Sequence, residues 1–181
     1  AWIVGLFVIG VVYGSIGEDV DDLLEDNPGY ADWFAQFEGA SLTDSYFATA
    51  MAMLAVIAAG FSISSTLQLR AEESTGRAES ILASAISRLR WAVAYLVIAV
   101  AGTVVIIAAA GAGVGVSYAV VVGDAGQIPR MIGASLVTVP AVLVLVGVAT
   151  LLFGLVPRWS LWAWLALALV GVVSFLGEVL R

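Results

Sequence analysis

The chain has 181 residues, of which 62% are hydrophobic and 12% are charged, and its net charge is −7. A soluble domain has about 25% charged residues. This composition therefore excludes an ordinary soluble fold and predicts an all-α, polytopic membrane protein, because backbone amides in lipid must be satisfied within helices. The absence of Cys and His excludes a thiol nucleophile, a Ser–His dyad and a structural zinc site, and the acidic balance argues against a nucleic-acid partner.

The apolar segments predict five transmembrane helices in one domain. We expect them over residues 1–16, 46–69, 91–121, 131–155 and 159–176. The first is short for a crossing, so we expect further residues upstream of it. Pro140 removes one helical hydrogen bond within the fourth, where a kink is expected. The GxxxG pairs Gly10–Gly14 and Gly111–Gly115 predict close helix packing.

The positions of the arginines predict the orientation of the spans. Four arginines lie in residues 70–90 and Arg158 lies between the last two spans, whereas the opposite side has only Arg130 and Arg181. The positive-inside rule therefore places residues 70–90 in the cytoplasm and residues 17–44 outside the plasma membrane.

The expected outer loop, residues 17–44, contains nine acidic residues and no basic one. Asn27-Pro28-Gly29 interrupts it, so two short helices are expected. In the second, four aromatic residues share one helical face: Tyr30, Trp33, Phe34 and Phe37. Such a face suits the membrane interface, and we interpret the loop as a cap over the span ends rather than as a ligand site. No calcium-loop spacing is present.

The middle of each expected span lacks ionisable residues. Proton-coupled transporters usually require such residues within the membrane, so proton coupling is not expected. The spans do carry hydroxyl groups, notably at residues 62–66. Because hydroxyls and carbonyls alone can hold Na⁺, a sodium-coupled carrier stays open as an alternative.

The connection over residues 70–90 is longer than a minimal helix–helix loop and has nearly balanced charge. Glu73 and Arg77 have the favourable i, i+4 order, and Ser74-Thr75-Gly76 weakens the helix locally. An apolar stripe follows at Ile81, Leu82, Ala85, Ile86 and Leu89. We predict a short amphipathic helix on the inner membrane surface that docks another protein. Glu72, Glu73 and Glu79 could also bind a metal ion, but the neighbouring arginines compete for them, and we assign no metal site.

The stretch "RAEESTGRAESILASAISR" between two apolar spans resembles the permease subunits of type-2 ABC exporters. The acidic outer loop and "FGLVPR" (153–158) are similar to those of the bacterial branch that exports polyketide antibiotics and drugs. This resemblance implies a coupling helix after Gly76 that sits in a separate cytoplasmic ATPase subunit. The matching motif residues are Glu72, Glu73, Gly76, Arg77 and Glu79. The resemblance also nominates Ser62, Ser64, Ser65 and Thr66 for the translocation path.

The family resemblance implies a non-catalytic permease that exports a hydrophobic or amphipathic small molecule such as an antibiotic. The chain itself would need no cofactor, because ATP and Mg²⁺ would bind to the partner ATPase. A family half has six spans and works with a second half, as a homodimer or a fused pseudo-dimer, so we expect this sequence to be one half trimmed at both ends. The alternatives are a membrane scaffold without transport and, less favoured, the sodium-coupled carrier.

Overall fold

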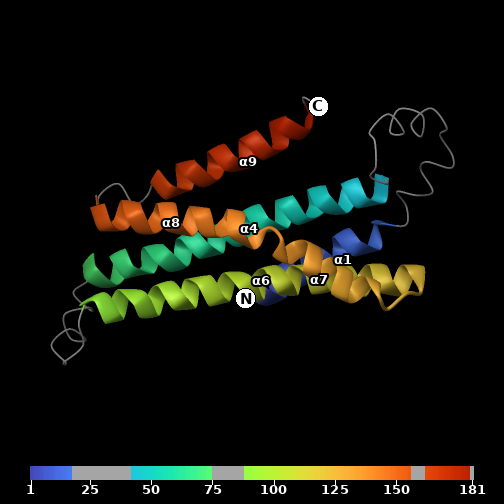
Figure 1. The fold of residues 1–181 in the computed structure, drawn as a ribbon, viewed down its shortest axis with the longest axis horizontal. Helices are drawn as coiled ribbons and strands as arrows, with labels where there is room; N and C mark the ends of the chain where they lie inside the picture. The colour runs from blue at the N-terminus through green and yellow to red at the C-terminus, as the bar shows by residue number, and fades with distance from the viewer. Residues whose placement is uncertain (18–41, 75–87, 156–161, 180–181) are drawn as a thin grey trace. The chain divides into compact units, whose positions relative to one another are not determined.

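The computed structural model describes residues 1–17, 42–74, 88–155 and 162–179 (Figure 1). The regular structure in these ranges is helical throughout, which confirms the predicted all-α membrane fold. The helices are α1 (Trp2–Ser15), α4 (Leu42–Ser74), α6 (Arg88–Val122), α7 (Gln127–Leu136), α8 (Val139–Leu155) and α9 (Ala163–Val179). The expected interfacial aromatic helix at residues 30–37 lies outside the described residues.

The five expected spans fall on these helices. Three stretches of the described chain are long and apolar enough to cross a bilayer, namely Thr43–Gln68, Val93–Val122 and Gln127–Leu152. Two shorter apolar helices, Trp2–Ser15 and Ala163–Val173, correspond to the first and last expected spans. The second helix begins earlier than expected, since Leu42 to Ser45 are already helical, where residues 17–44 were predicted to form a loop.

The fourth span is not one continuous helix. It consists of α7 and α8, separated by a turn at Val137 and Thr138. The backbone N–H and the hydroxyl of Thr138 both donate to the Ser135 carbonyl, at 3.0 and 2.7 Å. The interruption precedes Pro140, which is the second residue of α8. There its missing N–H costs no helical bond, because the first N–H groups of a helix have no partner within it.

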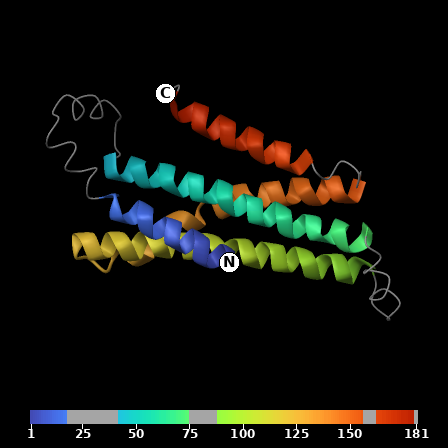
Figure 2. The ribbon, with the colours of Figure 1, turned by 180° about the vertical axis from the view of Figure 1, so that it is seen from behind.

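The chain divides into two compact units, and α4 and α6 each contribute to both. The first unit comprises Ala1–Ala55 and Ile106–Thr138. In it, α1 packs against α6 through glycines, and Figure 2 shows α1 alongside the C-terminal part of α6. A Cβ atom on Gly10 or Gly14 would collide with the backbone of Ala110 or Val114, and one on Gly113 would collide with the Phe7 carbonyl.

Helix α7 packs against the opposite side of α6. A Cβ atom on Gly111 would collide with the Ser135 hydroxyl, and one on Gly115 would lie 2.9 Å from the Cα of Ile128. Residues four apart share one helical face, whereas residues two apart point in nearly opposite directions. The glycines of "GAGVG" therefore serve two interfaces: Gly111 and Gly115 admit α7, and Gly113 admits α1.

The second unit comprises Val56–Val105 and Val139–Arg181. Its core is built around Ile63 of α4, Ala149 of α8 and Ala163 of α9, all buried, with Leu67, Leu152 and Leu167 packed against them. Helix α8 packs against α9. Small residues at the contacts let the backbones approach closely, as is common between membrane helices, where lipid removes the hydrophobic drive to associate.

Candidate functional site

Two helices continue beyond their apolar spans toward residues 75–87. The apolar stretch of α4 ends at Gln68, but the helix runs on to Ser74, and α6 begins at Arg88, ahead of its apolar stretch at Val93. Helix α4 has 33 residues, which at 1.5 Å per residue gives about 50 Å, against a hydrocarbon core of about 30 Å. A helix of this length projects beyond the core or tilts within it.

The predicted coupling residues divide between described and undescribed parts of the chain. Glu72 and Glu73 lie in the last turn of α4. Gly76, Arg77 and Glu79, and the predicted amphipathic helix after them, lie outside the described residues. No group of three acidic residues that could hold a metal ion occurs in the described part. Glu79, the third carboxylate of the alternative metal site with Glu72 and Glu73, lies outside that part.

The hydroxyl groups nominated for the translocation path do not share one environment. Ser62 and Thr66, one helical turn apart, are 0% and 2% exposed, whereas Ser64 and Ser65 are half-buried. The Thr66 hydroxyl donates to the Ser62 carbonyl at 2.9 Å, and the Ser64 hydroxyl donates to the Gly60 carbonyl at 2.8 Å. Within their unit, Ser62 and Thr66 thus face the protein interior, and Ser64 and Ser65 keep partial exposure.

Ser62 also joins α4 to α6. Its Oγ lies 2.6 Å from the Oγ1 of Thr103, which is likewise 0% exposed. The Ser62 hydroxyl is 2.9 Å from the Ala58 carbonyl, and the Thr103 hydroxyl is 2.6 Å from the Ala99 carbonyl. Two hydroxyls have only two hydrogens for these three contacts. One hydrogen is therefore shared, or the pair alternates between two arrangements, and both arrangements retain a bond between the helices.

We expect Thr103→Val to lower the free energy of unfolding by about 1 kcal/mol, within the range measured for hydrogen bonds between membrane helices. Valine has nearly the same shape as threonine, so the loss reports the hydroxyl contact with Ser62. Thermal unfolding should show a fall in melting temperature of about 3 °C. Thr150→Val is the matched control, because the Thr150 hydroxyl donates to Val146 within its own helix. Equal shifts for the two variants would show that the contact between helices adds nothing.

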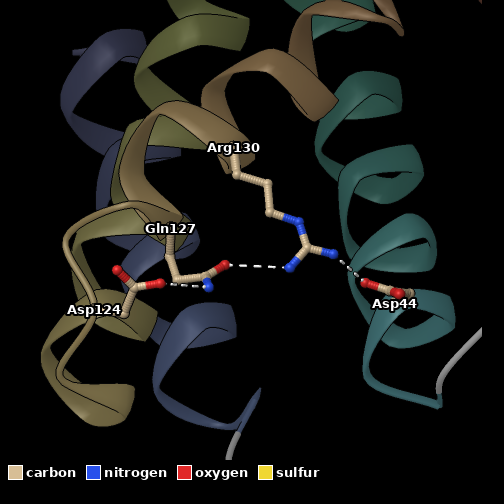
Figure 3. A network of polar contacts seen from close by, with 4 residues as sticks. All are labelled: Asp44, Asp124, Gln127 and Arg130. Carbon is tan, nitrogen blue, oxygen red and sulfur yellow. Dashed lines mark hydrogen bonds and ion pairs between the residues drawn. The ribbon is translucent and has the colours of Figure 1, made fainter.

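At the other end of α4, an ion pair connects α4 with α7 (Figure 3). Nη2 of Arg130 lies 2.8 Å from Oδ1 of Asp44, and the two side chains are 56% and 48% exposed. Nη1 of Arg130 donates to Oε1 of Gln127 at 3.4 Å, and Nε2 of Gln127 donates to Oδ2 of Asp124 at 3.0 Å. Oδ1 of Asp124 accepts from the Gly126 N–H at 2.9 Å. Such an exposed ion pair contributes about 0–1 kcal/mol, so it orients side chains more than it stabilises the unit.

The ion pair closes one end of a pocket between α4 and α7. The pocket has a volume of about 380 Å³ and is mainly apolar. Its lining residues are Asp44, Phe47, Ala48, Met51, Arg130, Met131, Ala134, Val137 and Thr138. The sequence reasoning missed this site. The available signal was the occurrence of opposite charges at the ends of two spans on the same expected side of the membrane.

Comparison with known proteins defines the family. The profile described as "Multidrug efflux system permease Rv1217c, C-terminal domain" matches residues 1–181, the whole chain. The chain belongs to this family. The multidrug efflux system permease protein Rv1217c of Mycobacterium tuberculosis is 37% identical over 187 residues, covering 99% of this chain and 34% of the relative. The chain thus spans about a third of the length of that permease.

The family confirms that the resemblance to an export permease was sound. It also supports the predicted placement in a membrane, together with the three long apolar helices. The relative is the permease of a multidrug efflux system.

Proposed function

We propose that this domain is part of the membrane-spanning permease of an ATP-driven exporter for hydrophobic or amphipathic small molecules. The observation that carries the proposal is the lack of titratable groups at the centres of the spans in a domain of the multidrug efflux permease family. The charged residues within the three long spans are Asp44 and Arg130, and each lies at a span end. This pattern supports an energy source outside the hydrocarbon core.

The two longest helices support the cytoplasmic elbow, residues 70–90, as the point of entry. Helix α4 enters the elbow and α6 leaves it, and both are helical beyond their apolar stretches. The buried contact between Ser62 and Thr103 connects the two helices within one unit. A force applied to the elbow would thus reach two spans that are already joined inside the membrane.

The partners follow from this mechanism. A cytoplasmic ABC ATPase subunit would dock on residues 70–90, through Glu72, Glu73, Gly76, Arg77 and Glu79, and would bind ATP and Mg²⁺. The permease itself hydrolyses nothing. A second permease half would complete the pathway. The domain would lie in the plasma membrane with residues 17–44 outside.

Charge reversal in the elbow tests the proposal. We expect the full-length permease carrying Glu73→Arg together with Arg77→Glu to co-purify with less ATPase than the parent, by a factor of about five or more. The reason is that each charge in a docked interface contributes about 1 kcal/mol or more. Export of a hydrophobic dye from vesicles should fall with it. Asp124→Arg, at the other end of the spans, is the control and should retain the ATPase.

Three results would contradict the proposal. Full ATPase retention with normal export by the elbow variant would remove residues 70–90 from the coupling pathway. Transport that depends on a sodium gradient and continues without ATP would instead establish a secondary carrier. A domain that binds the ATPase normally but moves no substrate would support the scaffold alternative.

A further inference from the structure

The pocket between α4 and α7 combines an apolar floor with a charged rim. Phe47, Met51 and Met131 line it and are 4%, 4% and 3% exposed. Ala48 and Ala134, which also line it, are exposed, so these small side chains leave the pocket open between the two helices. From Asp44 to Met51 the pocket follows α4 for about 10 Å, which is about a third of the hydrocarbon core.

Within the part of the chain that the structure describes, the guanidinium of Arg130 keeps hydrogen-bond donors that no residue uses. A guanidinium has five N–H groups, and among the described residues Arg130 uses one for Asp44 and one for Gln127. Both carboxylate oxygens of Asp124 already accept hydrogen bonds, and Asp44 is held by Arg130. The rim therefore offers donors to a ligand that accepts hydrogen bonds, and it offers little to a ligand that donates them.

We propose that this pocket binds a phospholipid of the adjacent membrane leaflet, with the phosphate at Arg130 and the first part of one acyl chain over Met51 and Met131. Basic side chains between membrane helices recognise lipid head groups in this way, and the guanidinium suits a phosphate geometrically. The bilayer supplies the ligand at high concentration to any groove that opens into it. The site is distinct from the proposed translocation path and depends only on the placement of the domain in a membrane.

Photolabelling of the full-length protein tests the site. The protein would be placed in phosphatidylcholine vesicles that contain a phosphatidylcholine with a photoreactive diazirine near the glycerol end of one acyl chain. Labels should appear in the peptides that contain Met51 and Met131. Ala134→Trp, which fills the groove, and Arg130→Gln, which removes the guanidinium and its positive charge, should each reduce these labels at least about fivefold, the loss expected for a charged hydrogen bond or an occluded site. Ala101→Trp replaces an exposed alanine of α6 and should leave labelling unchanged.

Asp44→Asn separates phosphate binding from the ion pair. It breaks the pair but keeps the guanidinium, so labelling should be retained or increased. A loss as large as that of Arg130→Gln would mean that the ion pair, and not a phosphate contact, shapes the groove, and would overturn the proposal. Equal labelling in Ala134→Trp and the parent, suppression by inorganic phosphate alone, or a protein segment cross-linked in place of lipid would overturn it as well.

Discussion

Replacing Gly10 by leucine is expected to lower the melting temperature of the protein by about 6–12 °C, which corresponds to a loss of about 3 kcal/mol. A side chain at this position would meet the carbonyl of Ala110 and the amide of Val114, which are backbone atoms of α6 and cannot turn aside. Helix α1 would have to separate from α6 along its length. The dispersion contacts between α1 and α6 would then be lost. No hydrophobic effect compensates for this loss, because lipid is as apolar as the helix surfaces.

The same helix contains a matched control for this prediction. A Cβ atom on Gly5 would meet nothing within 4 Å, so Gly5→Leu should leave the melting temperature within about 1–2 °C of the parent value. Gly113→Leu places a side chain in the same contact from α6, against the Phe7 carbonyl. It should lower the melting temperature by a similar amount. Thermal unfolding followed by size-exclusion chromatography measures both. Similar melting temperatures for Gly10→Leu and Gly5→Leu would show that α1 does not pack on α6 through its glycines.

The sequence predicted close packing at the glycines but not the partners. Spacing of four residues placed Gly10 with Gly14 and Gly111 with Gly115 on common faces, and the structure places both pairs in helix contacts. Which helix each face meets depends on how spans far apart in the sequence assemble. A single sequence contains no direct record of that, so the separate use of Gly113 for α1 and of Gly111 and Gly115 for α7 was not predictable.

The apolar runs coincide with apolar helices, because a segment that crosses lipid requires such a composition over about 20 residues. Their ends were less well defined. Asp44 and Arg130 lie near the ends of apolar stretches, where they are partly exposed and pair with each other, so each is tolerated inside a helix. The fourth span shows the converse effect, since its interruption at Val137 and Thr138 comes ahead of Pro140. Hydrophobicity alone predicts neither the charged residues inside the helix ends nor the interruption of the fourth span.

The candidate path residues show the same limit. Composition identified Ser62, Ser64, Ser65 and Thr66 as the polar positions of an otherwise apolar span, but it did not separate those that stabilise the unit from those available to a ligand. For Ser62 the distinction depends on its contact with Thr103, which lies 41 positions away in the sequence. Among the four hydroxyls, only those of Ser64 and Ser65 combine partial exposure with the predicted role, and they are the better positions for substitutions that probe the cargo path.

The second large effect is expected from Ala71→Pro, which tests α4 as a rigid connection between the membrane and the elbow. Ala71 lies in the helical segment between the end of the apolar stretch, Gln68, and the end of the helix, Ser74. Proline within a helix removes the bond to the carbonyl four residues earlier and costs about 3 kcal/mol. The helix should therefore bend or end between the lipid and the predicted docking residues, and export should fall at least about tenfold.

The diagnostic result is a loss of export without a loss of the partner. Because Ala71→Pro leaves the charges of Glu72, Glu73 and Arg77 in place, the ATPase should co-purify and hydrolyse ATP, with hydrolysis no longer stimulated by the exported molecule. Ala71→Leu keeps the helix and is the control, with export expected within about twofold of the parent, since leucine is nearly as good a helix former as alanine. Normal export by the proline variant would show that force does not pass along α4 and would shift the coupling to α6. Loss of the ATPase itself would show that this turn of α4 is part of the docking surface rather than a connection to it.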